Sequence, residues 1–337
     1  MNKHFYSLDY LRGFAAVSVC LFHFSDKFGF LPTDDPVKWA FSGGHFGVEI
    51  FFIISGLVIP YSMAKGQYTL SKVFVFLKKR FIRIEPPYLL CVLLALALNY
   101  ATTLSPVYVG KPFNIDYEQL FYHIGYLNGI MGKDWLNQVF WTLAIEFQYY
   151  LLIAVFFPFI NHKNWLVWGI SLIAFNASAS LFDRNFVFNF AIFFTTGILL
   201  YRYLADKSNR VEVIVSAVMV LGVLAYNYSY KELLVTIGTV IAAVLPLRPT
   251  WIGAFFGNIS YSLYLLHFPI GLRIINLAQR FSDVQSVRQM MVFVALLGSV
   301  FVAYFYYKYV EKPFKLMSAR VKYDTKASAA TRTVEEH

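Results

Sequence analysis

The sequence predicts an all-α polytopic membrane protein with about ten transmembrane helices around a central polar cavity. Of its 337 residues, 58% are hydrophobic and only 14% are charged, whereas a soluble domain is usually about a quarter charged. The apolar residues form continuous runs long enough to cross a bilayer, which takes about 20 residues. Because these runs do not alternate with polar residues, a porin-like barrel is excluded.

Ten apolar runs are predicted to be the membrane spans. They lie near residues 10–29, 45–64, 86–104, 139–160, 165–182, 186–203, 211–227, 232–247, 254–274 and 289–310. Asp9 and Arg12 interrupt the N-terminal run. We therefore expect an uncleaved first helix there rather than a signal peptide.

Basic residues give the chain a net charge of +10, and they gather between the apolar runs. This distribution is typical of cytoplasmic loops and excludes nucleic acid as a partner. The largest group is Lys65, Lys72, Lys78, Lys79, Arg80 and Arg83. The positive-inside rule then places both termini in the cytoplasm of a multi-pass protein of the cell (inner) membrane. Residues 68–83 are predicted to form a basic interfacial helix, after which Pro86 and Pro87 start the third span.

The C-terminal residues 318–337 are polar and rich in Lys, Ala and Thr. They are predicted to be a disordered cytoplasmic tail that follows a transmembrane domain over residues 1–317. Cys20 and Cys91 both lie within apolar runs, so we expect packing roles for them and neither a disulfide nor a metal site.

Two ionisable residues in the first run, Arg12 and His23, are eleven positions apart, within about 20° of three helical turns. They share one stripe with Ala16 and Val19, about 16 Å apart along the axis. Ionisable groups inside a membrane helix are costly and indicate function. Two structural interpretations stay open: Arg12 reaches the membrane interface, or His23 bonds a neighbouring helix.

Six stretches, taken together and in order, resemble a known family. They are LDYLRG (8–13) with His23, GVEIFFIISG (47–56), KRFIRIEPPY (79–88), WTLAIEFQYY (141–150), ISYSLYLLH (259–267) and VEKPF (310–314). Over about residues 7–315 the chain is similar to the membrane-bound acyltransferase-3 family of O-acyltransferases, which includes bacterial polysaccharide and O-antigen acetylases.

The resemblance implies a ten-span enzyme that moves an acyl group, often acetyl, from cytoplasmic acyl-CoA to a carbohydrate hydroxyl. The partners it implies are the lipid bilayer and a carbohydrate or lipid-linked glycan acceptor. The family's arginine–ten residues–histidine pattern falls on Arg12 and His23, its basic pair on Arg80 and Arg83, and its carboxylate on Glu146. The acidic position before the Phe-Phe pair, more usually Asp in the family, is Glu49 here.

Acyl transfer to a hydroxyl needs a general base, and His23 is the candidate because histidine titrates near neutral pH. Helix lengths and orientation predict that His23, Glu49, Glu146 and His267 all lie in the outer half of the membrane. We therefore expect one shared polar cavity, in which Glu146 or Glu49 orients His23 as a triad carboxylate does. A structural hydrogen-bonding role for each carboxylate is the alternative.

The donor is expected at the opposite, cytoplasmic end, where Arg12, Arg80 and Arg83 could bind the phosphates of acetyl-CoA. Membrane topology and anionic lipid are the alternative explanation of these basic residues. Candidate substrate contacts are His267, Tyr264, Tyr150 and Trp141. No metal is expected to take part.

Small residues at Ser55 and Gly56 are expected to allow close helix packing, since no base is placed near Ser55 to make it a nucleophile. Two alternatives to a carbohydrate O-acyltransferase stay open. One is transfer to another acceptor, such as an amino sugar amine or a macrolide hydroxyl. The other is a proton-coupled transporter, which the absence of inverted repeats disfavours.

Overall fold

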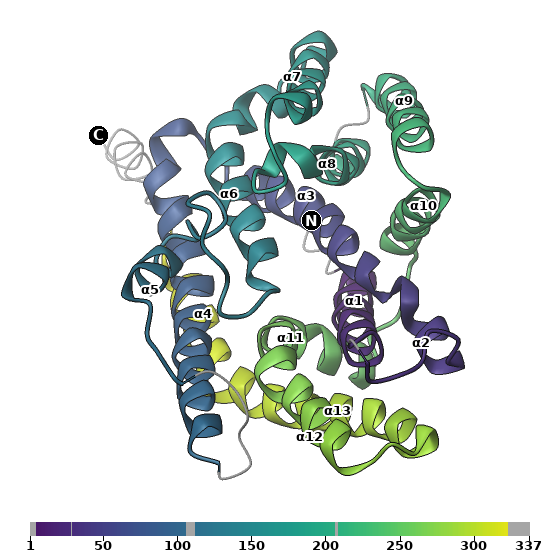
Figure 1. Ribbon diagram of the computed structural model, residues 1–337. Coiled ribbons are helices and arrows are strands. Elements are labelled where there is room, and N and C mark those ends of the chain that lie inside the picture. Colours follow the sequence, from purple (N-terminus) through teal and green to yellow (C-terminus); the bar gives the residue numbers. More distant parts are fainter. Residues whose placement is uncertain (1–4, 28, 106–111, 206–207, 323–337) are drawn as a thin grey trace.

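The computed structural model describes residues 5–27, 29–105, 112–205 and 208–322, and these contain helices and no strand. The described residues contain fourteen α-helices in chain order, of which α1 to α13 are labelled in Figure 1. They are α1 (Tyr6–Ser25), α2 (Pro36–Phe41), α3 (Gly47–Lys65), α4 (Val73–Thr103), α5 (Tyr117–His123), α6 (Phe140–Ile160), α7 (Trp165–Ala177), α8 (Ala191–Ala205), α9 (Arg210–Asn227), α10 (Tyr230–Val244), α11 (Trp251–Leu266), α12 (Arg273–Phe281), α13 (Gln285–Tyr306) and α14 (Lys312–Arg320).

Six helical segments of the described chain are long and apolar enough to cross a membrane. They are Pro36–Lys65, Leu70–Thr103, Phe140–Ile160, Val187–Ala205, Arg210–Asn227 and Gln285–Arg320. The prediction of a helical membrane protein is therefore confirmed, whereas the count of about ten spans is not. Helix α1, predicted to be the first span, begins at Tyr6 and carries both Arg12 and His23.

Helix α3 packs against α1, α6, α8 and α10, so it links the two sides of the molecule (Figure 1). Its closest neighbour is α8, and two glycines make this approach possible. A side chain at Gly56 would overlap the carbonyl of Phe194, and one at Gly197 would overlap the carbonyl of Ile53. The expected packing role of Gly56 is confirmed, because only hydrogen fits between the two backbones.

A second close crossing joins α1 to α11 and fixes the position of Arg12. Gly13 faces Phe256, and Gly257 faces the backbone of Asp9, each with no room for a Cβ atom. Because these contacts flank Arg12 on one side of α1, they hold its side chain toward the middle of the bundle.

Pro158 and Pro269 each leave the carbonyl four residues earlier without its helix donor, and side chains of other segments bond that carbonyl. In α6, Pro158 frees the carbonyl of Ala154, which accepts a 2.6 Å hydrogen bond from the hydroxyl of Tyr68. After α11, Pro269 frees the carbonyl of Leu265, which accepts bonds from the side chains of Asn137 and Cys91. The chain there forms a π-helical turn over His267–Leu272, a feature that often marks functional sites.

The basic helix and the C-terminal segment differ from the prediction. Helix α4 runs without a break through Pro86 and Pro87, so the expected interfacial helix and third span are one element. Helix α14 continues to Arg320, beyond the predicted domain boundary at residue 317. Ser318 donates a 2.7 Å hydrogen bond to the carbonyl of Lys79 and is buried, so α14 packs on the basic end of α4. The rest of the predicted tail, 323–337, lies outside the described residues.

Candidate active site

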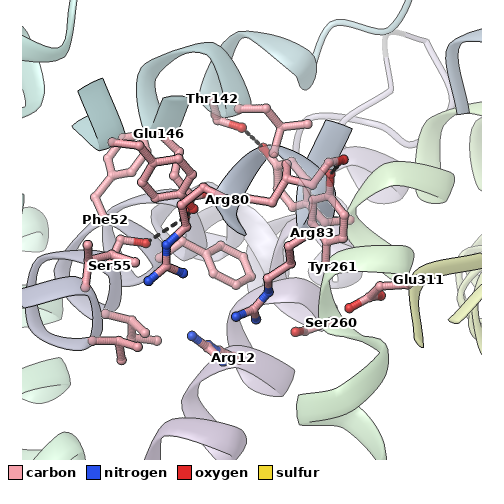
Figure 2. A pocket seen from close by; sticks show the side chains of 18 of the residues that line it. Arg12, Phe52, Ser55, Arg80, Arg83, Thr142, Glu146, Ser260, Tyr261 and Glu311 are labelled. Atoms are coloured by element: carbon pink, nitrogen blue, oxygen red, sulfur yellow. Dashed lines mark hydrogen bonds between the residues drawn. The ribbon is translucent and has the colours of Figure 1, made fainter. Parts of the chain in front are cut away.

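A cavity of about 120 Å³ lies where α1, α3, α4, α6, α11 and the segment around α14 meet (Figure 2). Its polar lining residues come from all six of these elements. They are Arg12, Ser55, Arg80, Arg83, Thr142, Glu146, Tyr150, Asn258, Ser260, Tyr261, Tyr264, Glu311 and Lys315. The described residues thus enclose a polar cavity, which contains the three arginines predicted to bind the donor but not His23, Glu49 or His267.

The guanidinium groups of Arg12, Arg80 and Arg83 point into this cavity (Figure 2). Arg80 and Arg83 are three residues apart and therefore project from the same face of α4. The guanidinium carbon of Arg80 lies 5.5 Å from the centre of the Tyr150 ring, a cation–π contact that fixes its orientation. Two helices that are distant in sequence thus bring three permanent positive charges together.

Glu146 lies among these arginines rather than beside His23. Its Oε1 atom accepts hydrogen bonds from Ser55 at 2.9 Å and from Tyr150 at 2.5 Å (Figure 2). The prediction that Glu146 and His23 share one cavity is therefore wrong, since Glu146 lines the cavity with Arg12 and His23 does not. Nor is Ser55 purely a packing residue, because its hydroxyl bonds a carboxylate in the cavity.

A wider cavity of about 380 Å³ adjoins the first and shares Arg12, Arg83, Asn258 and Lys315 with it. Its remaining lining comes from the start of α1 and the residues before and within α11. Because the two cavities share these residues, Arg12, Arg83 and Lys315 lie at the junction between the wide cavity and the narrow one.

The side chain of Tyr264 closes the narrow cavity on the side of the C-terminal end of α11. It is buried, and its hydroxyl forms a 2.6 Å hydrogen bond with the hydroxyl of Thr142. Thr142 in turn donates to the carbonyl of Val139 at 2.9 Å. The Tyr264 ring also contacts the ring of His267, with their centroids 5.6 Å apart. Tyr264 therefore separates the cavity from His267.

His23 and His267 pack against each other, with ring centroids 5.4 Å apart. Neither residue is among those that line the arginine-rich cavity. His267 is fully buried, while His23 is partly exposed and also contacts Phe268. Arg12 and His23 thus lie on one helix, as predicted, but they have different surroundings. Arg12 faces the cavity, and His23 packs against the π-helical turn after α11.

A family model described as "Acyltransferase domain" (Acyl_transf_3) matches residues 5–308. The chain belongs to the acyltransferase-3 family. Among curated relatives, it is 29% identical to the O-acetyltransferase OatA of Staphylococcus aureus (strain NCTC 8325 / PS 47) over 167 residues, which are 46% of this chain and 25% of OatA. It is 34% identical to "Protein 2 in picA locus" of Rhizobium radiobacter over 116 residues, 34% of this chain and 53% of that protein.

The alignment with OatA thus spans about a quarter of that relative, and the alignment with the Rhizobium protein about half. No solved structure matches the chain.

Glu49 and Trp141 lie apart from the cavity that is lined by Arg12, Arg80 and Arg83. Glu49 is on α3, near the charged groups of Arg184 and Glu232. Trp141 packs on Phe190 and lines a separate small cavity with Arg184. The predicted meeting of His23, Glu49, Glu146 and His267 in one cavity is therefore not found, because these side chains project from their helices in different directions.

Several cavity residues were not identified from the sequence. Glu311 is buried at the end of a π-helical turn and accepts a 2.6 Å hydrogen bond from Ser262. Lys315, one turn later, donates to Asn258 at 3.3 Å. A signal for Glu311 was present, since a carboxylate next to a long apolar run is costly unless it serves a site.

Proposed function

We propose that this acyltransferase-3 protein is a membrane O-acetyltransferase that moves an acetyl group from cytoplasmic acetyl-CoA to a hydroxyl of a cell-envelope or exported carbohydrate. One observation carries the proposal. Arg12, Arg80 and Arg83 surround a single cavity, and the helix that supplies Arg12 carries His23 eleven residues further on. The name of the relative OatA, an O-acetyltransferase, supports the type of reaction.

In this proposal the donor enters from the wider cavity. The phosphates of acetyl-CoA would bind Arg12, Arg83 and Lys315 at the junction of the two cavities, and Arg80 further in. Guanidinium groups suit this role because they give charge-assisted, forked hydrogen bonds to phosphate oxygens. The pantetheine arm would extend past Tyr264, which must swing aside, along the roughly 16 Å between Arg12 and His23.

The chemical step that we propose uses His23 as the general base. The acceptor hydroxyl oxygen attacks the thioester carbon, while His23 takes the hydroxyl proton. A C–O bond forms, the C–S bond breaks, and the coenzyme A thiolate leaves and later recovers a proton from the imidazolium. A thiolate is a good leaving group, so one base suffices.

The acceptor would approach from the opposite side of the membrane, because His23 is partly exposed near the end of α1 that is distant from Arg12. Cytoplasmic termini and a ten-span topology in the cell (inner) membrane are part of this proposal. The basic side chains of α4 support the orientation, since they face the same end of the molecule as the start of α1.

Transfer of labelled acetyl groups tests the proposal. The purified protein in lipid nanodiscs would be given radiolabelled acetyl-CoA and crude cell-envelope glycan. We expect label in the glycan that mild alkali removes, as for an O-ester, and its loss in a folded His23→Ala variant. Unlabelled glycan with the native protein would refute the activity. Undiminished transfer by His23→Ala would remove His23 from the mechanism.

A further inference from the structure

The protonation of His267 follows from its contacts. Its Nδ1 atom lies 2.7 Å from the carbonyl oxygen of Tyr264. A carbonyl only accepts hydrogen bonds, so Nδ1 carries the hydrogen and donates. In the neutral ring Nε2 then holds a lone pair and acts as an acceptor.

The Nε2 atom of His267 is buried and has no hydrogen-bond partner among the described residues. A buried acceptor without a donor is unfavourable by about 1–3 kcal/mol, and most such groups in proteins do have partners. The π-helical turn that begins at His267 is itself an uncommon conformation that tends to occur at functional sites. Both features indicate that Nε2 serves a partner.

His23 is the partner that the surroundings offer. The rings in contact with His267 are His23, Phe24, Tyr264 and Phe268. The phenylalanines have no donor, and the Tyr264 hydroxyl bonds Thr142. An N–H···N hydrogen bond of about 3 Å between two imidazoles places their centroids about 5 Å apart. The observed separation is 5.4 Å, with the rings tilted by 31°, so a small rotation of His23 forms this bond.

We propose that His267 is a positioning residue for the general base: its Nε2 accepts the N–H of His23 and thereby fixes the tautomer and orientation of that ring. The other nitrogen of His23 then keeps its lone pair toward the acceptor hydroxyl. When His23 takes the proton, the His267 lone pair stabilises the imidazolium, the role that a carboxylate has in a Ser-His-Asp triad. This inference rests on the proposed function, because it assigns the orienting role to His267 in place of Glu146.

Two substitutions of His267 separate this role from a structural one. In His267→Asn the amide nitrogen replaces Nδ1 and keeps the bond to Tyr264, but no acceptor reaches His23. In His267→Gln the amide oxygen replaces Nε2 as an acceptor, while the local bond to Tyr264 is lost. We expect His267→Asn to lower kcat for acetyl transfer at least about tenfold with KM for acetyl-CoA unchanged. His267→Gln should retain most of kcat, and the reverse order would overturn the proposal.

A spectroscopic measurement tests the inference without relying on catalysis. The protein has seven histidines, and with 15N-labelled imidazoles the signals of His23 are those that disappear in His23→Ala. We expect separate protonated and unprotonated nitrogen signals for His23 in the native protein and in His267→Gln, and averaged signals in His267→Asn.

Averaged His23 signals in the native protein would refute the inference even if no His267 variant folds. If the native protein transfers no acetyl group but its His23 signals are separate, the proposed function fails while the His23–His267 bond stands.

Discussion

The hydroxyl of Ser55 donates a 2.9 Å hydrogen bond to Oε1 of Glu146, inside the cavity that the three arginines share. A hydrogen bond between a serine and a carboxylate is also the arrangement of a nucleophile and its general base. However, Oε1 of Glu146 also accepts a hydrogen bond from Tyr150, and the carboxylate lies among guanidinium groups, so its contacts are those of a structural anchor rather than of a general base. Ser55 therefore acts as a hydrogen-bond donor that holds Glu146 in place.

Replacement of Ser55 by alanine tests this role. Loss of one hydrogen bond to a charged group is worth about 1.5–3 kcal/mol, so we expect kcat/KM to fall no more than about 100-fold. Removal of a nucleophilic serine would cost about a millionfold. Intact-protein mass spectrometry after incubation with acetyl-CoA should find no acetyl group on Ser55. Ser62→Ala, an exposed site on the same helix, is the control.

The arginines of α4 provide the second prediction. Arg80→Ala and Arg83→Ala each remove a permanent positive charge from the cavity. If both bind donor phosphates, each should raise the KM for acetyl-CoA by about 10- to 100-fold with little change in kcat. Lys78→Ala, on the exposed face of the same helix turn, should leave KM unaltered. An equal effect of all three substitutions would favour lipid contact over donor binding.

The sequence predicted the class of fold from the length of its apolar runs, and it pointed to Arg12, Arg80 and Arg83 through helical spacing, clustered basic residues and the resemblance to the acyltransferase-3 family. It did not predict which way each carboxylate faces. Depth along a span can be estimated from residue number, but the rotation of one helix about its axis depends on its neighbours. Glu146 accepts a hydrogen bond from Ser55, and Glu49 lies outside the cavity near the charges of Glu232 and Arg184, surroundings that only the assembled bundle specifies.

The contact between His23 and His267 could not be predicted from the sequence for a similar reason. The two residues are far apart in sequence, and His267 begins a π-helical turn, in which the residue spacing of a regular α-helix does not hold. Pro269 predicted a disturbance of the helix there, but not its form. The continuous α4 is a further example, since a proline pair ordinarily starts a helix rather than lying within it.

The crossing of α3 and α8 provides the third prediction. Gly56→Ala and Gly197→Ala would each force a methyl group into backbone atoms of the other helix, which we expect to destabilise the protein by at least about 2–3 kcal/mol. Gly238→Ala on α10 is the matched control, because a Cβ there meets open space. It should be neutral or slightly stabilising, since alanine favours a helix. Equal thermal unfolding temperatures for all three variants in detergent would contradict the glycine contact.

The fourth prediction concerns His123, which lies in α5, in the connection between α4 and α6. Burial lowers the pKa of His123 to about 4. The Nε2 atom accepts a 3.4 Å hydrogen bond from the backbone N–H of Leu136, and Nδ1 lies 2.7 Å from the hydroxyl of Tyr88. Protonation would place the ring's second hydrogen on Nε2, where the lone pair now accepts, and break the bond to Leu136.

An unfolded histidine binds a proton below about pH 6.5, whereas His123 in its folded segment does so only below about pH 4. Between these values the unfolded segment binds more protons, so its stability falls as the pH drops from about 6.5 toward 4. The ring of His123 contacts Trp135 at 5.5 Å, and a Trp135→Phe difference spectrum would isolate the fluorescence of that residue. We expect the Trp135 signal to change in this window and the change to vanish in His123→Gln. A signal that stays constant from pH 7 to 4 in the native protein would show that His123 does not couple this segment to protons.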